Sequence, residues 1–574
     1  MKYIGIDIGD GESAVTVVAE HGALLPAVVT LGNVKSIRSI VGNLNGKPVI
    51  GDTVVLNHAV RDRSARFKSR FLFEEQARED LSRFARGLRD LLAEQITGED
   101  VKIALGCPAQ WDPQDRARYA GIVGSAGFPN LYTVSESRAA FLYAHHCNEL
   151  GLSAETLKRP TLVIDIGSST LDYAYIVDGK ERDVGVFGEN RLGGGILDAL
   201  ILELAVSRAP DGAQIRQVFD TAPSWKHYCE LIARKLKEEY FLNEAQWADR
   251  SCRTIAPIYA DLTAPLSLQL SLNGLDMAAL LDRQLPELGD RSFRKALTDS
   301  LERAKEITRE NPPELLIVTG GASRMGFFRE ACRDVFPQAQ FALCEEPEFS
   351  IARGLGIAAR TDDMLSRFRQ KIGDYFDSGA IALEVERQLP HLLPEYVPAM
   401  SRILEKKAVF TAIMDYCGDV SNTRQLTAYI ADKIGDVMED RAQMEEADQI
   451  VNNWIAQRLT GIQDKLDASC SEFRIDRTDM SLVRIHAQVK LPQFRISPTV
   501  QLLTWLGQVP WIRERFAWLS NLDWIMTRKM RKTLTKQLSD PNGDFAKALC
   551  EKLVLQLQNQ IDAQTQKVEI RIDG

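Results

Sequence analysis

The chain has 574 residues with a formal net charge of -9, and 45% of them are hydrophobic while 26% are charged. This length is too great for one hydrophobic core, so we expect two to four domains. The acidic balance argues against a broad nucleic-acid surface, and nine cysteines without a Cys-x-x-Cys pair argue against metal fingers and redox motifs. Neither a signal-peptide pattern nor roughly 18 continuous apolar residues for a membrane span is present, which predicts a soluble cytoplasmic protein.

The sequence changes character near residue 360. Before it, short β-branched strands alternate with amphipathic helices, a pattern typical of α/β domains. After it, the region 361–574 carries mainly helical periodicity, in the segments 363–376, 396–416, 423–466 and 545–564. The alternating segment from Ser481 and the final KVEIRIDG could pair in a small sheet.

Three glycine-bearing segments lie before residue 360. They are YIGIDIGDGESAVTVV from Tyr3, LVIDIGSSTLDYAYIV from Leu162 and LLIVTGGASRMGFF from Leu315. The first two share an apolar run, an aspartate, a glycine turn and a second apolar run, which predicts two β-hairpins. Glycine permits positive φ and close backbone approach, so the amides of each turn could bind a phosphate. Taken singly, each segment is more often an ordinary strand followed by a glycine turn.

An aspartate precedes each predicted turn. A carboxylate beside phosphates repels them unless a divalent cation lies between, so Asp7 and Asp165 are candidate Mg²⁺ ligands, directly or through water. In the third segment, Gly320 and Gly321 follow an apolar strand and precede an amphipathic helix. That arrangement suits a flat ligand group lying against bare backbone, although a tight connection alone would also explain it.

In this order the three segments resemble the actin-like ATPase superfamily and, within it, the DnaK-type seventy-kilodalton heat-shock chaperones. The resemblance covers residues 1–360. It includes GKPVIGDTVVLNHAVRDRSARFKSRF from Gly46, which places Lys68 at the family's catalytic lysine. It also includes ALGCPAQWDPQDRARYAGIVGSAGF and LYTVSESRAAFLYA, which carry Pro108 and Glu136, as well as RLGGGILD from Arg191 and EFSIARGLGIAA from Glu348.

The resemblance implies two lobes, 1–160 and 161–360, with ATP or ADP, Mg²⁺ and K⁺ between them. It assigns catalysis to Lys68, Glu136, Asp165 and Thr170, and metal binding to Asp7, Asp165 and Asp172. It assigns nucleotide contacts to Gly9, Asp10, Gly11, Gly167, Ser168, Ser169, Gly193, Gly194, Lys237, Glu238, Gly320, Gly321 and Arg324. Alternatives stay open: Lys68 lies in a basic run, Glu136 could simply complement a helix dipole, and the helix of Lys237 is ordinarily amphipathic.

Two departures from the family matter. The first turn reads Gly9-Asp10-Gly11-Glu12 where the family has threonines, and two extra carboxylates oppose a polyphosphate unless they face solvent or meet a cation. Hydrolysis could therefore be slow. Region 361–574 contains no counterpart of the family's acidic linker or β-sandwich, so we expect a diverged helical module for an unknown client or partner. J-domain and nucleotide-exchange partners are implied by the resemblance alone.

Segment 504–537 holds Trp505, Trp511, Trp518 and Trp524, followed by a run of basic residues. An aromatic core capped by a solvated basic helix is the favoured interpretation, ahead of a partner-binding face and of peripheral membrane contact. Nucleic acid would need an aromatic and basic groove, which nothing else in the sequence indicates.

The sequence thus predicts an ATP-binding and ATP-hydrolysing chaperone-like protein, in which closure of the lobes controls the helical module. The alternative is an actin-like structural protein that polymerises with ATP. A third hypothesis is a small-molecule kinase in which Asp7 faces an acceptor hydroxyl, but no sugar-binding pattern accompanies it.

Overall fold

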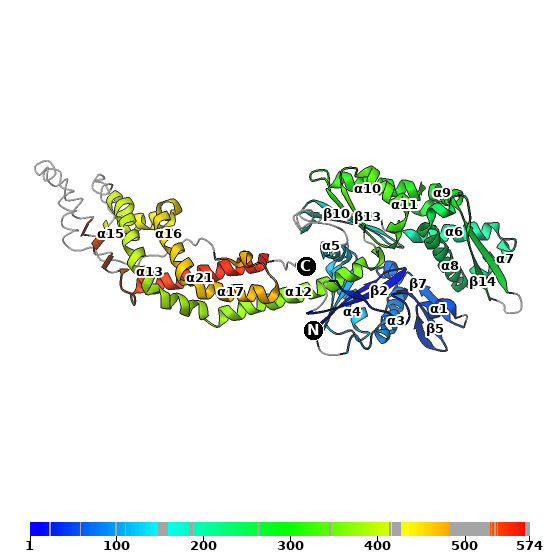
Figure 1. Cartoon of the computed structure of the whole chain (residues 1–574), viewed down its shortest axis with the longest axis horizontal. Coiled ribbons are helices and arrows are strands. Elements are labelled where there is room, and N and C mark those ends of the chain that lie inside the picture. Colours follow the sequence, from blue (N-terminus) through cyan, green and yellow to red (C-terminus); the bar gives the residue numbers. More distant parts are fainter. Residues whose placement is uncertain are drawn as a thin grey trace, which may run out of the picture. The chain divides into compact units, whose positions relative to one another are not determined.

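The computed structural model describes residues 1–21, 25–57, 59–97, 100–109, 111–146, 159–177, 180–182, 188–189, 191–260, 265–343, 346–412, 415, 426–482, 528–529, 531–532, 535–536 and 538–568. The chain forms two compact units, Met1–Asp362 and Asp363–Asp573 (Figure 1). The first contains mixed sheets covered by helices and the second is largely helical, which confirms the predicted α/β region followed by a helical one. Within the described residues, no helix is long and apolar enough to cross a membrane.

The first sheet is built on the predicted hairpin. Strand β1 (Lys2–Ile8) pairs antiparallel with β2 (Glu12–Ala19), and the parallel strands β8 and β9 continue the sheet beyond β1. The remaining members of this layer are β3 (Ala27–Val28), β4 (Ser36–Arg38), β8 (Val101–Cys107), β9 (Leu131–Ser135), α3 (Glu75–Leu91), α4 (Pro113–Gly124) and α5 (Glu136–His146).

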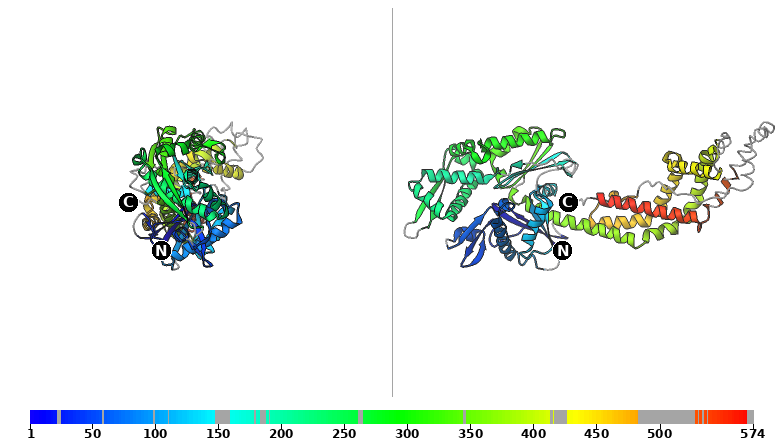
Figure 2. Two further views of the ribbon diagram at one scale, coloured as in Figure 1. Left: turned by 90° about the vertical axis from the view of Figure 1, so that its right-hand side faces the viewer. Right: turned by 180° about the vertical axis from the view of Figure 1, so that it is seen from behind.

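The second sheet repeats this topology. Strand β10 (Thr161–Ile166) pairs antiparallel with β11 (Leu171–Val177), as predicted, and two parallel strands again follow on the other side of β10. Its other members are β12 (Lys180–Arg182), β13 (Gly188–Glu189), β18 (Leu315–Thr319), β19 (Gln340–Leu343), α6 (Gly194–Arg208), α10 (Phe293–Ile307) and α11 (Gly326–Val335). Figure 2 shows the two halves of the first unit from behind, the first in blue and the second in teal and green.

Smaller elements complete the first unit. A three-stranded sheet with two short helices is inserted between β4 and α3, and three α-helices with two two-stranded sheets are inserted between α6 and α10. They are β5 (Ile40–Leu44), β6 (Lys47–Ile50), α1 (Asp52–Leu56), β7 (Arg61–Ala65), α2 (Phe67–Arg70), α7 (Gly212–Thr221), α8 (Pro223–Leu242), β14 (Cys252–Ile258), β15 (Leu266–Leu272), α9 (Gly274–Asp282), β16 (Gln284–Leu285) and β17 (Arg291–Ser292).

Two helices pack between the sheets. Helix α5 contacts strands of both sheets, and α12 (Pro347–Asp377) packs against the first sheet and α5. Glycine residues allow the backbone of α12 to lie close to those of α5 and β1. A Cβ on Gly354 would overlap the backbone of Ala139 in α5, and one on Gly5 would overlap the backbone of α12. The small residues therefore fix how α5 and α12 cross.

The second unit is a bundle with its own hydrophobic core, including Phe368, Tyr396 and Phe545, all of which are fully buried. The segment 423–466, predicted as helical, is divided among three helices. Asp440 caps a new helix by accepting the amides of Ala442 and Gln443, and another helix begins after Leu459. The helices after α12 that the structure describes include α13 (Ala380–Leu404), a π-helical turn (Glu405–Val409), α15 (Leu426–Glu439), α16 (Arg441–Arg458), α17 (Thr460–Phe473) and α21 (Asp544–Lys567).

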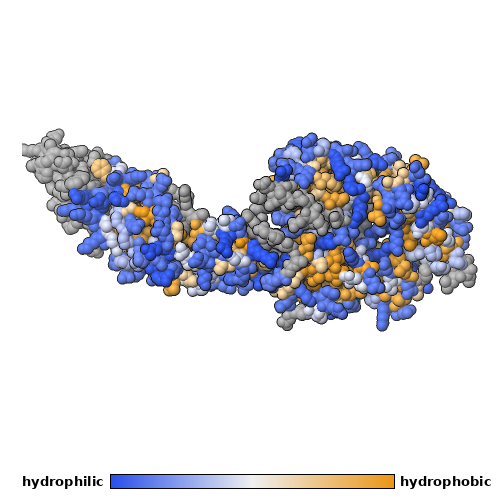
Figure 3. Space-filling model, viewed as in Figure 1, coloured by the Kyte–Doolittle hydropathy of each residue, from blue (hydrophilic) through white to orange (hydrophobic). Residues whose placement is uncertain are grey.

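The possible pairing of the segments near Ser481 and the C-terminal end involves residues outside the described ones, as do the four tryptophans of 504–537. Within the basic run, Arg531 pairs with Glu405, with 3.0 Å between the guanidinium and the carboxylate. On the face seen in Figure 3, hydrophobic residues of both units occur in small groups among hydrophilic ones, as is usual for folded proteins.

Candidate functional site

The two predicted turns have the same construction. Gly9 donates its amide to the carbonyl of Glu12 at 3.0 Å, and Gly167 donates to Thr170 at 3.0 Å, so each hairpin closes with a four-residue turn. Within the described residues, the amides of Asp10, Gly11, Ser168 and Ser169 have no hydrogen-bond partner. Unpartnered amides in a tight turn are donors suited to phosphate oxygens.

Strands β1, β8 and β9 end at one cluster of charged side chains. Asp7 lies near the end of β1, and Glu136 begins α5 directly after β9. Lys68 of α2 forms an ion pair with Glu136, and its ammonium lies 5.9 Å from the centre of the Tyr119 ring. The Lys68 side chain is only 8% exposed. The alternative that Lys68 is simply a solvated lysine of the basic run is therefore wrong. A buried lysine held by one carboxylate retains a directed positive charge.

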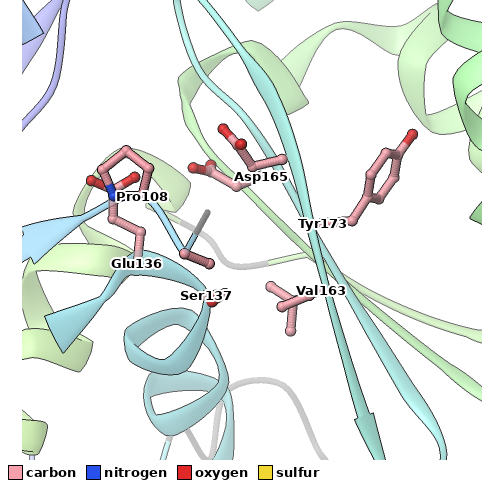
Figure 4. A pocket seen from close by; sticks show the side chains of 9 residues that line it. Pro108, Glu136, Ser137, Val163, Asp165 and Tyr173 are labelled. Atoms are coloured by element: carbon pink, nitrogen blue, oxygen red, sulfur yellow. The ribbon is translucent and has the colours of Figure 1, made fainter. Parts of the chain in front are cut away.

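The second sheet adds two carboxylates. Asp165 lies near the end of β10 and Asp172 is its register partner on β11, where Thr170 donates its hydroxyl to Asp172 at 2.7 Å. One carboxylate oxygen of Asp165 is buried without a hydrogen-bond partner in the described part of the chain. A small pocket is lined by both aspartates and by Glu136, and Figure 4 shows Glu136 and Asp165 reaching it from opposite sides while Tyr173 points away.

The charged groups of this cluster shift one another's pKa values. Burial raises the pKa of Asp7 to about 7, with Lys68 opposing the shift and Glu136 adding to it. Burial also raises the pKa of Asp172 to about 6, against the Thr170 hydrogen bond. The pKa of Asp165 is raised well above its usual range by burial and by the neighbouring carboxylates. Because burial and neighbouring carboxylates hold these aspartates back from ionising, a bound cation would favour their charged forms.

Stability of the metal-free protein should therefore depend on pH. Asp7 and Asp172 bind protons more tightly in the folded chain, so their contribution is fully present below about pH 4 and is lost as pH rises to their folded pKa values of about 7 and about 6, respectively. At about 1.4 kcal/mol per pKa unit, the expected loss is several kcal/mol. Urea unfolding in EDTA at pH 5 and 7.5 measures it. An Asp7→Asn/Asp172→Asn variant should show a flatter pH dependence; an unchanged slope would contradict the assignment.

The third predicted segment lies beside Asp165 of the same cluster. Gly320 follows β18, which pairs in parallel with β10, and has φ of 83°. A Cβ there would overlap the Asp165 carboxylate and the Ile166 carbonyl, so only glycine fits. Gly321 has open space beside it and begins a short 3₁₀ turn that ends at Arg324. Arg324 pairs with Glu348 at 2.9 Å on the exposed surface.

The glycine-rich segment at the start of α6 packs against the second turn. Gly194 donates its amide to Gly167 at 3.0 Å, and a Cβ on Gly193 would collide with the backbone of Ser168 and Ser169. Lys237 of α8 donates to the Gly194 carbonyl at 2.7 Å and pairs with Asp198 at 2.6 Å. Lys237 thus lies beside the second turn, whereas the neighbouring Glu238 pairs with Arg234.

The two unusual carboxylates of the first turn have partners within the protein. Asp10 accepts hydrogen bonds from the amides of Lys68 and Ser69, both at 3.0 Å, and so caps α2. Glu12 accepts from the Ser36 hydroxyl at 2.7 Å and lies 3.6 Å from the Arg234 guanidinium, which also packs on Gly11. Their charge is partly compensated before any ligand binds. Sequence reasoning missed Arg234, although its spacing of three from Lys237 places both on one side of α8.

No group of three or more acidic, histidine or cysteine side chains within the described residues is arranged to hold a metal ion by itself. Asp165 lies near enough to both Asp7 and Asp172 to be influenced electrostatically by each of them. Few carboxylates completed by phosphate oxygens and water are the ligand set that Mg²⁺ prefers, so these residues fit that ion together with a nucleotide. No protein-family model matches the chain.

Proposed function

We propose that the first unit is an actin-like ATPase domain that binds ATP with Mg²⁺ and hydrolyses it to ADP and phosphate. The observation that carries the proposal is the convergence, at the ends of two equivalent hairpins, of Asp7, Asp165 and Asp172 with Lys68 and Glu136. Two turns with unpartnered amides beside a cluster of carboxylates suit a phosphate chain accompanied by a cation.

Each residue then has a distinct role. Asp7, Asp165 and Asp172 hold Mg²⁺ directly or through water, and the ion when bound neutralises charge on the phosphates. Lys68 places a positive charge beside the transferring phosphoryl group, where negative charge spreads in the transition state. Glu136 keeps Lys68 in place and orients the attacking water, whose proton it accepts as the bond between the γ-phosphorus and the bridging oxygen breaks.

The nucleoside lies between the third segment and α8. Gly320 and Gly321 offer bare backbone, with Lys237 beside the second turn. Asp10 does not contact phosphate in this proposal, because its carboxylate already accepts two amides of α2. The first turn therefore binds the nucleotide through the backbone of Asp10 and Gly11, and Glu12 is neutralised by Arg234.

We further propose that the second unit recognises a protein client or partner in response to nucleotide, as a chaperone-like protein would. Its independent core and helical construction support a separate recognition module. Helix α12 supplies residues to both units, since Ile351 and Leu355 pack in the first and Phe368 and Ile372 in the second. A continuous helix gives changes at the nucleotide site a covalent route toward the bundle.

Calorimetric titration of the full chain with ATP tests the site, in Mg²⁺ and in EDTA, together with release of phosphate in the absence of any acceptor. We expect binding that strengthens with Mg²⁺, and an Asp165→Asn variant in which that strengthening is lost. Asp282→Asn, which removes an exposed carboxylate paired with Arg294, is the matched control and should behave as the parent. Absence of ATP binding would overturn the proposal, and phosphate transfer only to an added hydroxyl compound would favour a kinase.

A further inference from the structure

Strand β15 (Leu266–Leu272) forms one edge of a two-stranded sheet. It pairs antiparallel with β14 over seven residues, and the outward backbone groups of β15 have no hydrogen-bond partner among the described residues. Its leucines Leu268, Leu270 and Leu272 are fully buried, while Ser267 and Gln269 are exposed. Helices α6 and α8 contact the sheet, so one face is covered and the edge remains available for a further strand.

The two edges of this sheet differ chemically. Strand β14 carries Arg253 and Pro257, and charged residues and proline both discourage pairing at an edge. Strand β15 reads LSLQLSL and contains neither a charge nor a proline. An uncharged edge of this kind is suited to main-chain pairing with another strand.

The sequence of β15 is also the same in both directions, with Gln269 at its centre. In an antiparallel pair of two such strands centred on Gln269, Leu266 faces Leu272, Ser267 faces Ser271, and Gln269 faces its own copy. Because side chains alternate between faces, the leucines of both strands then lie on the same face and the serines and glutamines on the other. A strand that is complementary to itself in this way meets the requirement of a two-fold interface.

We propose that β15 is a self-association edge, at which two copies of this chain join their two-stranded sheets into one four-stranded antiparallel sheet. Each copy contributes the same strand, so the interface closes as a dimer rather than growing into a filament. The contact is small beside the roughly 1,600 Å² typical of stable complexes, and the dimer should therefore dissociate on dilution. The proposal does not depend on the nucleotide site.

Sedimentation velocity of the full chain between about 1 and about 200 µM tests it, in the range where small interfaces dissociate. We expect a monomer–dimer equilibrium. Gln269→Lys and Gln269→Glu each place like charges opposite one another and should weaken the dimer about fivefold or more. Mixing the two variants should restore association, with mixed dimers above the statistical half in native mass spectrometry, because position 269 then pairs lysine with glutamate.

Ile255→Lys is the matched control. Ile255 is 60% exposed and is the register partner of Gln269, but it lies on the other strand and away from the proposed edge. This variant should dimerise as the parent does. A chain that is monomeric throughout, a dimer indifferent to both Gln269 variants, or a mixture with no excess of mixed dimers would each overturn the proposal. Circular dichroism confirms that the variants remain folded.

Discussion

Replacing Lys68 with alanine is expected to lower ATP turnover by at least about 100-fold, the usual effect of removing one group that stabilises transition-state charge. Lys68 is buried, pairs with Glu136 and lies near Asp7. The substitution also leaves these carboxylates without their cation, which should cost about 3 kcal/mol of stability. Phosphate release and urea unfolding of the intact chain measure the two effects separately.

A Lys68→Met/Glu136→Gln variant distinguishes loss of catalysis from loss of folding. It removes both charges of the buried pair, so most of the stability should return while turnover stays low. Lys295→Ala serves as control, because Lys295 pairs with Asp299 at 2.7 Å on an exposed helix surface. If Lys68→Ala hydrolysed ATP as fast as the control, Lys68 would have no catalytic role.

Replacing Gly354 with valine is expected to destabilise the first unit by about 3 kcal/mol or more, at the upper end of overpacking effects. A Cβ at this position would overlap the carbonyl group of Ala139, and backbone cannot move aside as a side chain can. Helix α5 must then shift, and it begins with Glu136. We expect turnover to fall along with the midpoint of urea unfolding.

Gly121→Ala is the control for this substitution. Gly121 lies within helix α4 of the same unit, and a Cβ there would meet nothing within 4 Å. Alanine is favoured over glycine in a helix by about 1 kcal/mol, so the control should be as stable as the parent or slightly more stable. If both variants unfolded at the same urea concentration, the close crossing of α5 and α12 would not be a determinant of stability.

The elements that local sequence determines were predictable. Alternating apolar residues around Gly9 and Gly167 predict the two hairpins, and the apolar run before Gly320 predicts β18. The crossing of α5 with α12 was not predictable from the sequence, because it depends on a glycine in one helix meeting the backbone of another helix more than 200 residues away. Nor did periodicity indicate that β15 would become an edge, since pairing partners are set by the whole sheet.

For the candidate site, the sequence identified the groups but not all of their partners. Lys68 and Glu136 were assigned through resemblance, and the structure brings them together in one ion pair. Asp10 and Glu12 were expected to oppose a polyphosphate, yet Asp10 caps α2 and Glu12 meets Arg234. Both contacts join distant segments, and a single sequence contains no signal for such contacts beyond the charge of each residue.

The equal turns of β1–β2 and β10–β11, together with the shared strand order of their sheets, are what tandem duplication of an ancestral gene segment would leave. Asp7 and Asp165 hold equivalent positions in these two hairpins, as do Glu12 and Thr170. Lys68 and Glu136, by contrast, both come from the first half, so the symmetry of the backbone does not extend to the charged side chains beside it.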